Sequence, residues 1–419
     1  MGTRPLFPYL LAATIGVVNL PFGNPALLAL TPTNGLLQRP ALESSLEFSV
    51  VTQTAVIAQA SAADYLKQGQ QRLGDGDLAG AEAALRQAIH LEPNLADTHS
   101  FLGIILFGQG KLEDAIAEYR QAIRLDPKEG SVHNNLGFTL FAQGKVDEAI
   151  AEYHQAIRLT PNDPFAYNNL GFAFFTQGKL EEAVVAYQQA LRIYPNFAHT
   201  HSSLALILTT QGKTEEAMAE YRQVIRLDPK DASAHNNLGL LLSGQDKLEE
   251  AIAEYHQAIR LDPSNVMAHN NLGLALFKQG KLTEAIAEYD KAIELAPDMT
   301  IAYNNRGFAL FQQGKITEAI AEYRHAIRHD PNNFIAHDNL AGALCQQGHI
   351  EDCLFEYRLA LEINPNYAPA HFRLGKTLYD RGQVQEGLAA IKQARLLAQT
   401  QKNEQMVRLI DQLLQQISH

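Results

Sequence analysis

The sequence predicts an all-α solenoid of about ten stacked helix-turn-helix repeats, followed by a C-terminal capping helix. First, a unit typified by residues 133–161, HNNLGFTLFAQGKVDEAIAEYHQAIRLTP, recurs every 34 residues. Second, prolines keep that same spacing over most of the chain: Pro93, Pro127, Pro161, Pro195, Pro229, Pro263, Pro297, Pro331 and Pro365. One hairpin of this size cannot bury its own apolar faces, so successive copies must stack on one another.

Each unit contains two amphipathic helices separated by a tight turn. Their apolar and small residues recur at helical spacing, as in Leu136, Gly137 and Leu140, then Ala149, Ile150, Tyr153, Ala156 and Ile157. Between them Gly144 can adopt the left-handed conformation that commonly ends a helix. We expect the second helix to end near Leu159, because the residue before Pro161 is steered away from helical angles.

Small residues recur where the two helices of a unit must cross closely. The first helix carries a glycine column, interrupted by Ala205 and Ala341, and the second carries alanines around a tyrosine column: Tyr119, Tyr153, Tyr187, Tyr221, Tyr255, Tyr289, Tyr323 and Tyr357. This pattern of Leu-Gly, Ala, Tyr, Ala and Pro resembles the tetratricopeptide repeat family. The resemblance covers residues 62 to about 400. It implies a right-handed superhelix whose first helices line a concave groove, and it implies protein binding.

The N-terminal part, residues 1–60, differs from the repeats and is predicted to be a targeting segment and flexible linker. Arg4 precedes an apolar run, residues 6–20, that Pro8 interrupts. This run is shorter than the roughly 20 residues that span a bilayer, which favours a signal peptide over a permanent anchor. We expect an exported or membrane-associated protein, in a periplasm-like cell envelope. A tether to the membrane through this segment belongs to this expectation, and a disordered leader on a cytoplasmic protein is the alternative.

The remaining boundaries follow from the repeat register. Residues 61–401 hold the ten repeats and residues 402–419 the capping helix, which has one apolar face: Met406, Leu409, Ile410, Leu413, Leu414 and Ile417. The net charge of -12 and the pI near 5.7 argue against a nucleic-acid partner, which would require a basic excess. The glutamates lie mostly on second helices, which is typical of a solvated surface.

The sequence contains no recognisable catalytic or cofactor motif. Residues 211–214, QGKT, resemble the end of a phosphate-binding loop, but Ile207 stands where such a loop needs glycine, and no strand precedes it. No serine, histidine and aspartate set is evident. Because the repeats fill the chain, we expect a non-enzymatic protein without cofactors.

Histidine and cysteine are the residue types that could act as metal ligands or cross-links. The histidine column, His99, His133, His201, His235, His269, His337 and His371, includes Tyr65, Tyr167 and Tyr303. A metal site would not tolerate phenol at three positions, so these are interpreted as packing residues rather than metal ligands. Cys345 and Cys353 are the only cysteines. We expect them to act as small hydrophobes, with a disulfide as the alternative, because the sequence does not fix their distance.

The groove is the candidate functional site. Two ladders run along the first helices, and the residues we expect to contact a partner are Asn135, Asn169, Asn237, Asn271, Asn305 and Asn339, with Phe141, Phe175, Phe277 and Phe311. Carboxamides both donate and accept hydrogen bonds, so a row of them can hold the backbone of an extended peptide. Phenylalanines beside them would select apolar side chains.

Three alternatives stay open at this stage. The asparagines could bond neighbouring helix ends while the phenylalanines fill space between successive first helices. A similar asparagine groove occurs in the repeat domain of O-linked N-acetylglucosamine transferase, so the chain could be a regulatory component of a glycosyltransferase system. As a scaffold for envelope polysaccharide assembly, it would use the same asparagines and aromatic rings to bind sugars.

Overall fold

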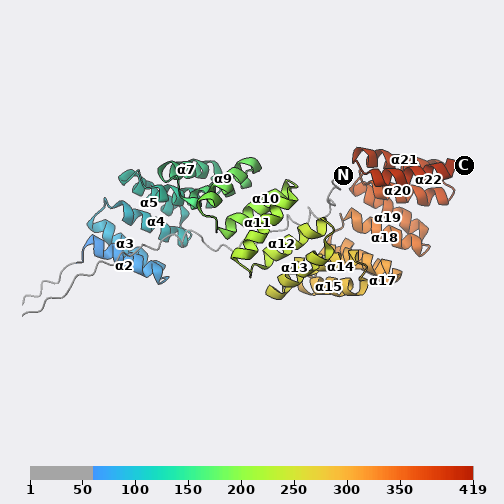
Figure 1. Ribbon diagram of the computed structural model, residues 1–419, viewed down its shortest axis with the longest axis horizontal. Coiled ribbons are helices and arrows are strands. Elements are labelled where there is room, and N and C mark those ends of the chain that lie inside the picture. Colours follow the sequence, from blue (N-terminus) through green and yellow to red (C-terminus); the bar gives the residue numbers. More distant parts are fainter. Residues whose placement is uncertain (1–59, 419) are drawn as a thin grey trace, which may run out of the picture. The chain divides into compact units, whose positions relative to one another are not determined.

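The computed structural model describes residues 60–418, which form 21 α-helices and no strand. The predicted targeting segment lies outside these described residues. The chain divides into two compact units, Met1–Gln211 and Gly212–His419. Within each unit, consecutive helices form antiparallel pairs that follow one another along the chain (Figure 1). The predicted all-α solenoid of stacked helix-turn-helix repeats is confirmed.

The helices of the first unit are nearly uniform in length, with 13 residues in each first helix and 14 in each second helix. They are α2 (Ala62–Gly74), α3 (Leu78–Leu91), α4 (Ala96–Gly108), α5 (Leu112–Leu125), α6 (Gly130–Ala142), α7 (Val146–Leu159), α8 (Pro164–Thr176), α9 (Leu180–Ile193) and α10 (Ala198–Thr210).

The second unit continues the same alternation and ends in two longer helices. Its helices are α11 (Thr214–Leu227), α12 (Ala232–Gly244), α13 (Leu248–Leu261), α14 (Val266–Lys278), α15 (Leu282–Leu295), α16 (Thr300–Gln312), α17 (Ile316–His329), α18 (Phe334–Gln346), α19 (Ile350–Ile363), α20 (Ala368–Asp380), α21 (Val384–Thr400) and α22 (Glu404–Ser418). None of the described helices is both long and apolar enough to cross a membrane.

The turn inside each hairpin depends on a residue with left-handed backbone angles. Gly144 has a φ of 80°, and its N–H donates to the carbonyl oxygen of Phe141, while the next N–H, of Lys145, donates to Leu140. These bonds satisfy carbonyl groups that the end of the helix would otherwise leave without partners. Asp246 takes the same position in the α12–α13 turn with a φ of 64°, which aspartate tolerates better than most residues.

A tyrosine packed against a glycine closes six of the described hairpins. Tyr153 on α7 is 1% exposed, and a Cβ added to Gly137 on α6 would lie 2.8 Å from its ring and 3.1 Å from the carbonyl oxygen of Ala149. The same glycine and tyrosine approach recurs in the hairpins of Gly103, Gly171, Gly239, Gly273 and Gly307. The small residues predicted at the helix crossing are therefore required by the close approach of the two helices.

The last helix, α22, covers the apolar end of α21. Ile410 is fully buried against Ile391 and Ala394, and the rest of its apolar face packs around them: Met406, Leu413, Leu414 and Ile417. Leu409 was placed on the same face, but it is 51% exposed. The apolar side chains thus bury the surface that a further repeat would otherwise cover.

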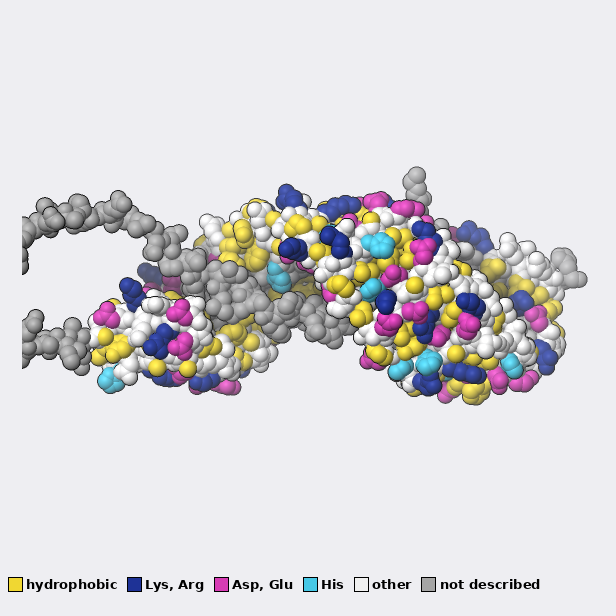
Figure 2. Space-filling view, turned by 90° about the horizontal axis from the view of Figure 1, so that it is seen from below, with side chains coloured by type: hydrophobic (Ala, Val, Ile, Leu, Met, Phe, Trp, Pro, Cys, Tyr) yellow, Lys and Arg dark blue, Asp and Glu magenta, His cyan; other side chains and the backbone are white. Residues whose placement is uncertain are grey.

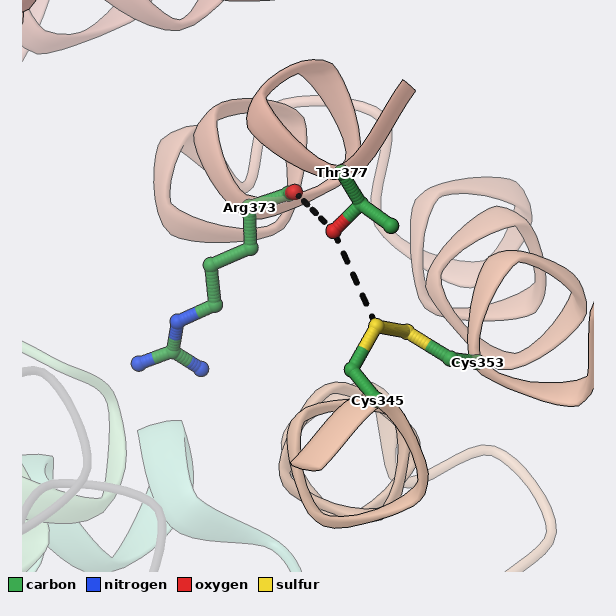
Figure 3. The surroundings of a disulfide bond; sticks show 4 residues. All are labelled: Cys345, Cys353, Arg373 and Thr377. Carbon is green, nitrogen blue, oxygen red and sulfur yellow. Dashed lines mark hydrogen bonds between the residues drawn. A yellow bond between two sulfur atoms is a disulfide. The ribbon is translucent and has the colours of Figure 1, made fainter. Parts of the chain in front are cut away.

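The interpretation of the cysteines as small hydrophobes was wrong. Cys345 and Cys353 form a disulfide with a Cα–Cα distance of 5.3 Å (Figure 3). Cys345 lies in the last turn of α18 and Cys353 in the first turn of α19. The tight hairpin turn brings these two turns together, so residues eight apart in the sequence come within bonding distance. The helical pattern alone did not show that both side chains point into the hairpin.

We expect Gly137→Val to destabilise the first unit, because the added side chain would overlap the ring of Tyr153. Overpacking of this kind typically costs about 1–3 kcal/mol. Thermal unfolding followed by circular dichroism should show a lower midpoint temperature for Gly137→Val than for the unmodified chain. Ala142→Val, on an exposed position of the same helix, is the matched control for the lower helix propensity of valine. Equal transitions for the two variants would contradict the packing role of Gly137.

Candidate protein-binding face

The candidate face is the side of the first helices that carries the asparagine pair of the motif and the phenylalanines that follow it. In the first unit it lies on α6 and α8, and in the second unit on α12, α14, α16 and α18. Successive first helices contact one another within each unit. Side chains at one motif position can therefore meet their counterparts in the next repeat.

Hydrogen bonds between side-chain amides connect the asparagine pairs of neighbouring repeats. In each case the asparagine at the second position of the motif pair donates through Nδ2 to Oδ1 of the asparagine at the first position in the preceding repeat. The distances are 3.0 Å from Asn169 to Asn134, 3.1 Å from Asn271 to Asn236, 3.0 Å from Asn305 to Asn270 and 2.9 Å from Asn339 to Asn304. We call these bonds the amide ladder.

The amide ladder uses only part of the hydrogen-bonding capacity of each second asparagine. An asparagine amide has two N–H donors and two acceptor lone pairs. Asn169 donates once to Asn134 and accepts from Asn168 over a long 3.5 Å. Asn237 similarly accepts from Asn236 at 3.3 Å. Asn135, Asn169, Asn237, Asn305 and Asn339 are half-buried, whereas Asn271 is only 5% exposed. Asn271 is therefore the least accessible of the predicted contacts.

In both units, other residue types also contribute to this row of side chains. The hydroxyl of Thr200 donates to Oδ1 of Asn168 at 2.8 Å. In the second unit Arg373 donates to Asp338, and these residues stand at the two positions that asparagines hold elsewhere. Burial raises the pKa of Asp338 to about 6, although the positive charge of Arg373 acts in the opposite direction. A charged pair thus replaces the amide pair between α18 and α20.

Two of the predicted phenylalanines, Phe141 and Phe277, form ring pairs between successive first helices. The ring centroids are 5.3 Å apart in both Phe141–Phe172 and Phe277–Phe308. Phe175 is half-buried, and Phe311 packs beside a hydrophobic cluster of the second unit. A packing role for these residues between first helices is therefore observed. For the asparagines, the observed bonds run from amide to amide rather than to neighbouring helix ends.

Sequence reasoning missed a series of hydrogen bonds between histidine and glutamate. Nδ1 of each histidine lies 2.6–2.7 Å from a glutamate Oε2 on the second helix of the same repeat, in the pairs His99–Glu118, His133–Glu152, His235–Glu254, His269–Glu288 and His337–Glu356. Nε2 faces the carbonyl oxygen of the preceding proline in several repeats, for example Pro331 at 3.1 Å from His337. These histidines link the two helices and the turn before them.

The sequence contains a signal for these pairs that the column of histidines alone did not reveal. Each of these glutamates follows its histidine by 19 residues, and where the column has Tyr65 or Tyr167 the corresponding residue is Ala84 or Ala186. Tyr303 keeps only the bond to the proline, at 3.1 Å from its hydroxyl to Pro297. Glutamate therefore accompanies histidine in most repeats, and the two exceptions are Tyr303, which Glu322 follows, and His371, which Ala390 follows.

Arg306 stands where most repeats have leucine. Its positive charge has an acidic partner on each of the two neighbouring second helices. Its guanidinium lies 2.5 Å from Asp290 on α15 and 2.5 Å from Glu322 on α17. Elsewhere, Lys, Arg, Asp and Glu side chains are intermingled on the surface that Figure 2 shows. The visible part of the described residues therefore presents no continuous field of one sign.

Family models for the tetratricopeptide repeat match the chain over residues 103–197, 205–300 and 309–348, with overlaps between the individual matches. A model described as TPR repeat matches residues 103–144, 139–178, 205–246 and 309–348, and two described as tetratricopeptide repeat match residues 238–300 and 164–197. Together the matches cover more than half of the chain. The chain belongs to the tetratricopeptide repeat family. Members of this family are typically non-enzymatic scaffolds that bind other proteins, and the repeats of this chain support a protein-interaction scaffold.

Several solved structures are similar to this chain at low sequence identity. YrrB, described as a TPR protein with an unusual peptide-binding site, is 22% identical with a TM-score of 0.41 over 44% of this chain and 95% of its own. PilF of Pseudomonas aeruginosa is 23% identical, with a TM-score of 0.46 over 49% and 94%. Yeast Tom70 is 14% identical, with a TM-score of 0.46 over 85% and 96%. No curated protein matches the sequence.

We expect the pair of His337 and Glu356 to make stability depend on pH. Burial opposes protonation, but the bonds to Glu356 and to the carbonyl of Pro331 outweigh it, and the pKa of His337 is raised above its ordinary value. Asp330 adds to this effect. The stabilisation is therefore complete below the unfolded pKa of about 6.5 and is lost as pH rises through the folded pKa.

NMR titration of the imidazole measures this effect directly. Glu356→Gln should lower the titration midpoint of His337 and remove its share of the loss of stability at rising pH. Glu362→Gln, an exposed change on the same helix, should alter neither quantity. If Glu356→Gln leaves the titration midpoint of His337 unchanged, the bond to Glu356 does not raise the pKa of this histidine.

Proposed function

We propose that this protein is a non-enzymatic adaptor whose first-helix face binds an extended segment of a partner protein. The amide ladder is the observation that carries the proposal. It holds the second asparagine of four pairs by the same bond to the preceding repeat. The remaining donor and acceptor sites of these amides are thereby oriented before a ligand arrives, which reduces the entropy that binding costs.

The spacing of the ladder suits an extended backbone. Packed helices lie about 8–10 Å apart, and an extended chain rises about 3.3 Å per residue. One asparagine per repeat can therefore meet about every third residue of the bound segment. A bond to the peptide backbone does not depend on the side chain of that residue, so the ladder supplies affinity with little sequence preference.

The phenylalanines supply an apolar border to the ladder. Phe308 is 36% exposed although its ring also contacts Phe277. An apolar side chain of a partner can thus bury surface against rings whose positions are already fixed by packing. Rigid aromatic anchors of this kind contribute most to binding where they are desolvated.

Changing Asn237, Asn271 and Asn305 together to alanine should abolish peptide binding while helical content is retained. The probe is a library of short random peptides displayed on phage and selected on the full chain. Circular dichroism reports folding, and fluorescence anisotropy of the selected peptides reports affinity. The matched control changes the exposed Glu250, Glu284 and Glu318 of the same three repeats to alanine. Peptide binding that survives the asparagine changes would overturn the proposal. So would selection of no peptide while soluble oligosaccharides bind.

We also propose that the protein resides in an oxidising compartment outside the cytoplasm. The Cys345–Cys353 disulfide supports this location, because disulfides persist in secreted and periplasmic proteins and are rare in the cytosol. The acidic composition and the repeat fold are compatible with either location. The proposal agrees with the targeting segment expected at the N-terminus.

Alkylation of intact cells before lysis tests this location. The two cysteines share one tryptic peptide, residues 329–358, so the oxidised form is lighter than the reduced form by two hydrogens and carries no alkyl group. We expect the oxidised peptide to dominate in mass spectra. Dominance of the doubly alkylated peptide would contradict the proposed compartment. Lysate reduced before alkylation provides the reference for the reduced form.

A further inference from the structure

We propose that the open space above Gly342 binds an aromatic side chain of the partner segment, with an acidic residue of that segment next to it. This inference rests on the proposed function and names the chemistry that the face selects. The space is called the Gly342 notch. It lies on α18. The preceding first helix, α16, carries Phe311, and the next first helix, α20, carries Arg373 and Lys376.

A repeated ring contact shows that a side chain is missing at this point. Phenylalanine pairs between successive first helices have centroids 5.3 Å apart, in Phe107–Phe138, Phe141–Phe172 and Phe277–Phe308. The second member follows the first by 31 residues in every pair. For Phe311 the corresponding residue is Gly342. Phe311 thus lacks the ring that covers Phe107, Phe141 and Phe277.

The glycine leaves room for a side chain rather than for a close helix crossing. A Cβ added at Gly342 would meet only the hydroxyl oxygen of Tyr357, at an ordinary contact distance of 3.7 Å. At Gly307, a packing glycine of the preceding first helix, a Cβ would lie 2.8 Å from the ring of Tyr323. Gly342 is therefore not required by the packing of its own hairpin.

The surroundings favour an aromatic occupant over an aliphatic one. Phe308 and Phe311 lie together on α16, and Phe308 is among the exposed large apolar residues of the described chain. A ring placed over Gly342 would make the offset or edge contact that the other pairs make, and such contacts stabilise beyond the burial of area. The disulfide between Cys345 and Cys353 holds the end of α18 next to α19.

Two cations on the other side of the notch account for the acidic neighbour. Lys376 occupies the position of Gly342 one repeat further on, and Arg373 lies one turn before it. Their side chains are 52% and 43% exposed, and they pair with Asp380 and Asp338. The guanidinium has five N–H donors, so a bond to Asp338 leaves others for a carboxylate. The exposed Lys376–Asp380 pair is weak enough for a ligand to replace.

The test fills the notch with the missing ring. Peptides are selected from the phage library on the full chain, and their affinities are measured for Gly342→Phe, Gly342→Ala and Lys376→Gln. We expect the selected peptides to share an aromatic residue beside an acidic one. Gly342→Phe should weaken their binding at least about tenfold. Gly342→Ala, which adds one methyl group without a clash, should bind nearly as the unmodified chain does.

Lys376→Gln tests the cation without touching the core, since this side chain is exposed. It should weaken the binding of the selected acidic peptides. The binding of peptides that carry asparagine in place of aspartate should not change. The proposed role of the Gly342 notch would be overturned if the selected peptides contained no aromatic residue. It would also be overturned if Gly342→Phe bound them as tightly as the unmodified chain does. The proposed function would survive that result if alanine at Asn237, Asn271 and Asn305 still abolished binding. Selection of no peptide would overturn both.

Discussion

The contact between a tyrosine ring and a bare glycine Cα is the constraint on which the rest of this structure depends. In six of the described hairpins it brings the two helices close together, as Tyr153 and Gly137 do, and it leaves both helices with one apolar side still uncovered. The next hairpin covers that side, so stability is a sum of hairpins and of the interfaces between neighbours. Where the glycine column changes to Ala205 or Ala341, the residue remains small.

Repetition of this contact has a consequence for every other side chain. A residue at one motif position meets its counterpart from the next repeat in nearly the same geometry each time. The amide ladder and the phenylalanine pairs arise in this way between neighbouring repeats, and the histidine and glutamate pairs recur within single repeats. The glutamines at the ends of first helices form another such series, since Gln177 bonds to Asp147 and Gln279 to Glu249 of the preceding repeat. Interactions that are weak singly are thereby multiplied along the stack.

The sequence was sufficient to predict the hairpins because their signals are local. Glycine turns, proline stops and columns of small residues all act within one repeat, and the observed helices follow them. The partners of polar side chains were not predictable in the same way. Whether Asn169 faces a ligand or Asn134 depends on the distance between first helices, which no motif encodes. The disulfide was missed for a similar reason, because a helical pattern does not tell how two side chains meet across a turn.

The departures from the repeat matter most for specificity. On a perfectly uniform ladder, a bound segment shifted by one repeat would make the same contacts, so the register would not be defined. Register requires positions that differ from their neighbours, and the second unit contains several. Arg306 replaces an apolar residue, Asp338 and Arg373 replace asparagines, and Gly342 replaces a large apolar residue. These differences lie on three successive first helices, α16, α18 and α20. Under the proposed function, the uniform repeats would supply affinity, and this irregular group would fix where the segment binds.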